Sequence, residues 1–138
     1  MSKLGRTIIG SLLTASALAL PALPAQAQVR RFIAFENACN FPVRVYISHA
    51  DGHRNWHPHG PFIIQAREGP IRLEASGVTL TQTENHELYF YAESLDASRY
   101  WDGSDHRATY NGVNYRMRRA NVEIEGGWLN ARLTCGND

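Results

Sequence analysis

The stretch PVRVYIS, residues 42–48, alternates strictly between two kinds of side chain. Every second position is aliphatic, namely Val43, Val45 and Ile47, and the positions between them are polar or aromatic. A period of two is that of a β-strand with one buried face, whereas an amphipathic helix repeats its apolar residues every three or four positions. The stretch therefore predicts one strand of a half-buried sheet.

The same alternation recurs along most of the chain beyond residue 30. It is clear in RFIAFEN (31–37), HELYFYAES (86–94), YRMRR (115–119), NVEIE (121–125) and WLNARLTC (128–135), and weaker in FIIQA, IRLEAS and VTLTQ. Turn-forming pairs such as Asn111-Gly112 and Gly126-Gly127 separate the runs and favour hairpins. We therefore expect an all-β fold, a single antiparallel β-sandwich or partly closed barrel of about eight strands.

The first 27 residues have the organisation of a secretory signal peptide. Lys3 and Arg6 precede an uncharged, mostly apolar run, and the segment ends in the small-residue pattern Ala25-Gln26-Ala27. The apolar run of about a dozen residues is short for a bilayer core ~30 Å thick. We expect cleavage after Ala27, which leaves residues 28–138 as one periplasmic or secreted β-domain without a membrane span. A retained membrane anchor is the alternative.

Two cysteines, Cys39 and Cys135, lie near the two ends of the predicted domain. In an oxidising compartment such a pair predicts a disulfide, here one that joins the first and last strands. Free thiols for redox or metal chemistry are the alternative, although the chain contains no Cys-x-x-Cys. Without Lys3 and Arg6 the 14 basic residues fall to 12, against 13 acidic ones. Because nucleic-acid binding normally requires a basic excess, we expect no nucleic-acid partner.

The segment HADGHRNWHPHG, residues 49–60, is rich in histidine and contains His49, His53, His57 and His59. Neutral imidazoles are good ligands for Zn²⁺ and Cu²⁺, so the segment is a candidate metal site, with Asp51 as an added carboxylate. The spacing matches no specific metal motif. The alternatives are a polar loop with Trp56 packed onto the sheet, or a surface that responds to pH.

A second segment, residues 93–112, combines aromatic and polar residues. Ser104, Asp105 and His106 are neighbours in the sequence, but members of a catalytic triad meet through the fold, and the chain has no Gly-x-Ser-x-Gly turn. A hydrolase is therefore a poorly supported hypothesis. The carboxylates also lack the spacing of a calcium loop. A wide turn stabilised by its own Asp and Ser side chains is the simpler interpretation.

Aromatic residues are the third feature. Tyr46, Tyr89 and Tyr91 lie opposite the aliphatic faces of their strands, beside Arg44, and would form either a surface for a sugar or protein partner or a second core. Trp56 and Trp101 would be the exposed anchors of such a surface. The candidate binding residues are Trp56, Tyr89, Tyr91, Tyr100, Trp101 and Asp102.

Short motifs between about residues 33 and 135 resemble those of a bacterial family of small exported domains of unknown function. They are Asn37-Ala38-Cys39-Asn40, Pro42-Val43-Arg44-Val45, Trp56, Gly60, Leu88-Tyr89-Phe90-Tyr91-Ala92-Glu93 and Trp101-Asp102-Gly103. The chain departs from the family in having only two cysteines. The resemblance implies an exported β-rich domain and supplies no catalytic residues. The start Phe35-x-Asn37-x-Cys39 is also similar to the opening strand of the larger, more disulfide-rich thaumatin-like sandwiches.

Together these observations favour an exported, non-enzymatic β-domain that binds a protein or glycan partner in the cell envelope. The first alternative is a periplasmic Zn²⁺- or Cu²⁺-binding protein that uses the segment 49–59, and a hydrolase is the second. Apart from such a metal ion, we expect no cofactor.

Overall fold

The computed structural model describes Gly10 and residues 29–52, 55–83 and 87–136. The predicted signal peptide, except for Gly10, and the histidine His53 therefore lie outside the described residues. Within the described ranges no helix is long and apolar enough to cross a membrane.

The described residues form thirteen strands. Eight strands have five or more residues: β1 (Arg31–Asn37), β2 (Val43–Ala50), β3 (Trp56–Ile64), β8 (Tyr89–Ser94), β10 (His106–Tyr110), β11 (Val113–Arg119), β12 (Asn121–Glu125) and β13 (Trp128–Leu133). The other five have two residues each: β4 (Ile71–Arg72), β5 (Glu74–Ala75), β6 (Val78–Thr79), β7 (Thr81–Gln82) and β9 (Tyr100–Trp101). The predicted all-β fold is confirmed.

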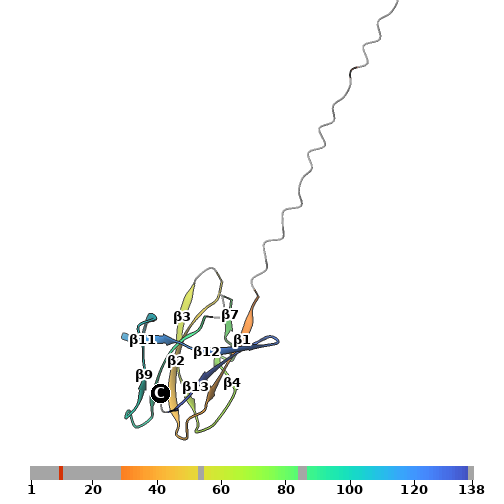
Figure 1. Ribbon diagram of the computed structural model, residues 1–138. Coiled ribbons are helices and arrows are strands. Elements are labelled where there is room, and N and C mark those ends of the chain that lie inside the picture. Colours follow the sequence, from red (N-terminus) through yellow and green to blue (C-terminus); the bar gives the residue numbers. More distant parts are fainter. Residues whose placement is uncertain (1–9, 11–28, 53–54, 84–86, 137–138) are drawn as a thin grey trace, which may run out of the picture.

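The strands form two main sheets (Figure 1). The first sheet has the order β12-β13-β1-β4, with β7 also paired to β1, and the second has the order β10-β11-β8-β2-β3, with β9 paired to β8. All the pairings are antiparallel except that of β1 with β13, which run in parallel. The first and last strands of the described residues are therefore neighbours.

A hairpin of β5 and β6 interrupts the edge of the first sheet. β4 and β7 pair with successive halves of β1. Between them, the Leu73 N–H donates to the Ile33 carbonyl, and the Ile33 N–H donates to the Leu80 carbonyl. The six residues 74–79 thus project from the sheet edge, because the chain leaves it at Leu73 and returns at Leu80. This hairpin forms one wall of the groove described below.

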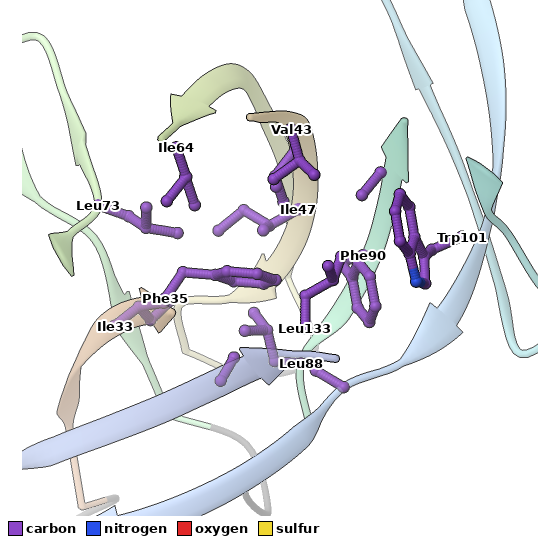
Figure 2. Close-up of a cluster of buried hydrophobic side chains, with 14 of the residues drawn as sticks. Ile33, Phe35, Val43, Ile47, Ile64, Leu73, Leu88, Phe90, Trp101 and Leu133 are labelled. Atoms are coloured by element: carbon purple, nitrogen blue, oxygen red, sulfur yellow. The ribbon is translucent and has the colours of Figure 1, made fainter. Parts of the chain in front are cut away.

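The core lies between the two sheets. In Figure 2 apolar side chains of the sheets point toward one another, those of Ile33, Phe35 and Leu133 from the first and those of Val43, Ile47 and Phe90 from the second. The aliphatic face predicted for residues 42–48 is therefore the face that packs in the core, since Val43, Val45 and Ile47 are all fully buried.

One disulfide joins Cys39 and Cys135, whose Cα atoms lie 5.1 Å apart. Cys39 follows β1 and Cys135 follows β13, so the bond fastens together the ends of the parallel pair. Asn37 supports the same corner from inside the core. Its amide donates to the carbonyls of Phe41 (2.9 Å) and Gln65 (3.0 Å), and its oxygen accepts from the Cys39 N–H (3.0 Å).

The segment 49–60, for which a polar loop was one interpretation, is mostly strand: β2 continues through Ala50 and β3 begins at Trp56. Pro58 and Pro61 suggested a loop, but β3 pairs with β2 along one side only. Proline is tolerated on such an edge because its missing N–H faces away from the ladder. The prediction of a loop was wrong here for this reason.

Candidate functional site

A groove of about 730 Å³ opens between the β2–β3 hairpin and the β5–β6 hairpin. One wall carries His49, Asp51, His57 and His59, and the other carries Ser76, Val78 and Thr79. Arg30, just before β1, and Phe32 on β1 also line the groove. A mixed apolar and polar cavity of this size is within the range of ordinary ligand sites.

A bulge in β3 brings the histidines to the same face. Val45 pairs with Phe62 but Ile47 pairs with His59, so β3 has one more residue than β2 over this interval. The extra residue moves the side chains before it on β3 to the opposite face of the sheet. His57 therefore lies opposite His49, and His59 lies diagonal to it. Without the bulge, Pro58 would occupy the position opposite His49.

Gly60 makes this bulge possible. Its φ is +151°, and a Cβ there would lie 2.7 Å from Cδ1 of Tyr46 and 3.0 Å from the Val45 carbonyl oxygen. Only glycine fits both the conformation and the close approach of the two strands. The Gly60 noted in the sequence thus has a structural role in placing His57 and His59.

His49 is the buried member of the three. Its side chain follows Ile47 on the core face of β2 and is 4% exposed. The ring atom Nδ1 lies 2.6 Å from the Thr81 carbonyl oxygen. Because a carbonyl only accepts, Nδ1 carries the proton and donates it, which leaves Nε2 as the basic nitrogen. This Nε2 is buried and has no hydrogen-bond partner among the described residues.

His57 and His59 contact the His49 ring from β3. The ring centroids lie 5.8 Å apart for His49 and His57, and 5.0 Å apart for His49 and His59. Burial lowers the pKa of His49, an effect that the hydrogen bond to Thr81 opposes and that His59 and His57 reinforce. Burial and the neighbouring His57 also lower the pKa of His59. Both shifts favour the neutral form of the ring, which can accept a hydrogen bond or bind a metal.

Three of the four histidines predicted to bind metal thus gather on one wall, and the fourth, His53, lies outside the described residues. Among the described residues no group of three or more His, Cys, Asp or Glu side chains could hold a metal ion in its present conformation. Asp51 lines the same groove, but its carboxylate pairs with Arg30 at 3.3 Å.

The aromatic face predicted on the second sheet is a half-buried ring cluster. Tyr46 stacks on Tyr115 at 4.3 Å, and Tyr91 contacts Tyr115 at 5.3 Å. β10 lies near β3, so the sheet curls over this face. Met117 and Ala108 are buried here, apart from the main core. The alternative of a second core therefore describes these tyrosines better than an open surface does.

Trp56, Tyr89 and His106 form the other half of this cluster. The His106 ring stacks on Tyr89 at 4.7 Å and contacts Trp56 at 5.2 Å. The two segments singled out in the sequence do meet here. They meet, however, on the face opposite the three groove histidines. Asp105 accepts a hydrogen bond from the Arg119 N–H at 2.8 Å, so its carboxylate is engaged away from the groove.

Trp101 does not fit its predicted role as an exposed anchor. Its side chain is only 8% exposed, it packs on Phe41, and its indole N–H donates to the Thr134 carbonyl at 3.3 Å. That prediction was wrong because side chains alternate along the short strand β9, and the side chain of Trp101 is the one that points into the core. Its neighbours Tyr100 and Asp102 are exposed, but they lie outside the groove.

Ser48 forms a pair with His106 that the sequence did not reveal. Its hydroxyl oxygen lies 3.0 Å from Nε2 of His106, which is the geometry of a nucleophile and its base. Ser48 is only 1% exposed, however, beneath the ring cluster. A substrate cannot reach a hydroxyl buried in this way, so the pair stabilises the sheet and does not support the hydrolase hypothesis.

Comparison with known proteins gives no further guide to the site. No family model, no curated protein and no solved structure matches the chain.

Proposed function

We propose that the protein is an exported, non-enzymatic domain of the cell envelope that binds a protein partner in the groove between the β2–β3 and β5–β6 hairpins. The Cys39–Cys135 disulfide indicates an oxidising, extracytoplasmic environment. The start of the sequence favours secretion or residence in the periplasm. The resemblance to small exported bacterial domains supports the same assignment.

The observation that carries this proposal is the apolar rim of the groove. Phe32 is 46% exposed and Val78 is 67% exposed, although both are large apolar side chains. They lie on different elements and line the same groove. Large exposed apolar side chains beside polar ones are typical of the anchor points of protein interfaces.

A protein partner fits this rim better than a glycan does. Sugars stack on the faces of aromatic rings, and Phe32 already packs against Trp128 at 5.4 Å. Val78, Leu80 and Ala75 are aliphatic and offer no such face. The opposed charges of Arg30 and Asp51 would give the partner its orientation.

Photo-crosslinking tests the proposal. A photoreactive residue at position 78 of the exported protein is expected to form one defined adduct, and the partner identified from it is then purified. Val78→Asp should weaken binding of the purified partner by about tenfold or more, because the charge is buried on association. Val113→Asp is the matched control, since Val113 is 49% exposed on β11 and does not line the groove.

Two results would contradict the proposal. Equal weakening by Val113→Asp would place the partner elsewhere on the domain. An adduct that resists proteases but is removed by glycosidases would assign the groove to a glycan.

A further inference from the structure

We propose that His49, His57 and His59 bind one divalent transition-metal ion, Zn²⁺ or Cu²⁺, at the histidine wall of the groove. This inference goes beyond the binding of a protein partner. It depends on the imidazoles, whereas the partner site depends on Phe32 and Val78.

His49 has one buried ring nitrogen without a hydrogen-bond partner among the described residues. A buried polar atom without a hydrogen bond costs about 1–3 kcal/mol, so native structures rarely retain one without a reason. Nε2 of His49 is such an atom among the described residues. Its lone pair is free because Nδ1 holds the proton. A metal ion would satisfy this lone pair directly.

The other ring nitrogen of His49 fixes the orientation of the ring. A histidine that binds a metal commonly donates its other ring N–H to a carbonyl or carboxylate, which fixes both the tautomer and the ring orientation. The 2.6 Å hydrogen bond from Nδ1 to the Thr81 carbonyl has this arrangement. It also ties β2 of the second sheet to β7 of the first. Residues of both sheets therefore fix the position of Nε2 of His49.

The distances between the imidazole rings suit a shared metal ion. Two imidazoles that share a tetrahedral ion at about 2.0–2.1 Å have ring centres roughly 5 Å apart. The separations of His49 from His59 (5.0 Å) and from His57 (5.8 Å) are close to this value. His57 and His59 are two residues apart on one strand, so both side chains leave β3 on the same side.

The three imidazoles must reorient to converge on one ion, because no three-residue metal centre is formed among the described residues. His49 is held in place, whereas His57 and His59 are only half-buried on the edge strand β3. Rotation of these two rings about χ2, a broad and roughly two-fold torsion in histidine, would turn their nitrogens toward Nε2 of His49 while the ring centres stay near their present separations. Metal binding would therefore order the rings of His57 and His59 around the fixed ring of His49.

Asp51 supports a cation at this wall. Its carboxylate lines the groove, and its partner Arg30 is an exposed side chain. Exposed ion pairs of this kind contribute about 0–1 kcal/mol, so Arg30 is released at little cost. The carboxylate would then offset the charge of the ion.

Calorimetric titration of the metal-free, oxidised domain with Zn²⁺ or Cu²⁺ alone at pH 7.5 tests the site. We expect one ion per chain with a Kd below about 1 µM. His57→Ala and His59→Ala should each weaken binding by at least about tenfold, since even partners outside the coordination sphere contribute that much. His106→Ala is the matched control, because His106 is equally half-buried but lies on the opposite face.

A Kd above about 1 µM would overturn the proposal. So would binding that both His57→Ala and His59→Ala leave unchanged, or that His106→Ala weakens as strongly. Far-ultraviolet circular dichroism checks that each variant is folded. The titration contains no partner protein, and Val78→Asp leaves the imidazoles intact. Failure of the metal site and failure of the partner site can therefore be told apart.

Discussion

Asn37 shows how much one buried polar side chain contributes to this fold. The residue is fully buried, and its amide connects the end of β1 to the carbonyls of Phe41, Ile64 and Gln65. The Asn37-x-Cys39 spacing in the sequence has a physical basis here, because the Asn37 oxygen accepts the Cys39 N–H. The side chain therefore orders the corner at which the disulfide forms.

Asn37→Ala is expected to lower the free energy of unfolding by about 2–4 kcal/mol, because it leaves several buried backbone groups unpaired. Urea denaturation of the oxidised protein measures the change. Asn40→Ala is the matched control, since Asn40 is exposed and should change the stability by no more than about 0.5 kcal/mol. Equal effects of the two substitutions would show that the Asn37 hydrogen bonds contribute nothing specific.

His106 makes the stability of the domain depend on pH. Burial lowers its pKa below the ordinary value of about 6.5, so the unfolded chain takes up the proton first as the pH falls. The stability from the neutral ring is fully present above about pH 6.5 and is lost progressively below it. His49 and His59 are shifted in the same direction and add to the effect.

We therefore expect the metal-free protein to unfold more easily at pH 5.0 than at pH 7.5, and His106→Gln to show a smaller difference between the two values. Chemical denaturation in the presence of a chelator measures both. A difference that His106→Gln leaves unchanged, or greater stability at pH 5.0, would contradict this assignment.

At the scale of elements, the bulge in β3 determines which side chains face the groove. Gly60→Ala places a methyl group 2.7 Å from the Tyr46 ring and forces an unfavourable φ on alanine. We expect a loss of about 1–3 kcal/mol in stability together with weaker metal binding, because His57 and His59 lose their register. Gly127→Ala is the matched control, as nothing lies within 4 Å of a Cβ there. Unaltered metal affinity in Gly60→Ala would show that the bulge does not place the histidines.

The long strands could be predicted from alternation alone, because one face of each is buried in a shared core. The two-residue strands β4 to β7 could not be assigned individually, because each is too short to show a period. β4 and β7 follow the edge of β1, and β5 and β6 pair with each other. The runs IRLEAS and VTLTQ predicted strands there without the projecting β5–β6 hairpin. Pro58 and Pro61 argued against a continuous strand at β3 in the sequence. Proline interrupts a central strand, but an edge strand such as β3 tolerates it.

The candidate site was predictable only in part for the same reason. The sequence identified the histidines, and the bulge that aligns them became visible only with the pairing of β2 and β3. Trp101 was predicted to be exposed because its turn is polar, yet its own side chain packs in the core. Ser48 and His106 come together through the curl of the second sheet, which no local pattern encodes.

At the scale of the whole molecule, the disulfide closes almost the entire domain. Cys39 and Cys135 are 96 residues apart in sequence, and they fasten the parallel strands β1 and β13. The sequence predicted the bond but not the parallel pairing. Replacing both cysteines by serine should lower the stability by about 4–5 kcal/mol, chiefly because the unfolded chain gains entropy. Thermal unfolding with and without reductant measures this, and a reductant that leaves the Tm unchanged would contradict it.

The further inference places a metal ion at the histidine wall of the groove, and not at the aromatic face of the second sheet. The most direct test is a titration of the ¹⁵N-labelled residues 28–138 with Zn²⁺, followed through the backbone amide resonances. We predict shifts confined to residues 49–51, 57, 59 and 79–81, with the amides of Tyr89, His106 and Tyr115 unmoved. Shifts centred on those three residues, or no saturable shifts at all, would contradict the claim.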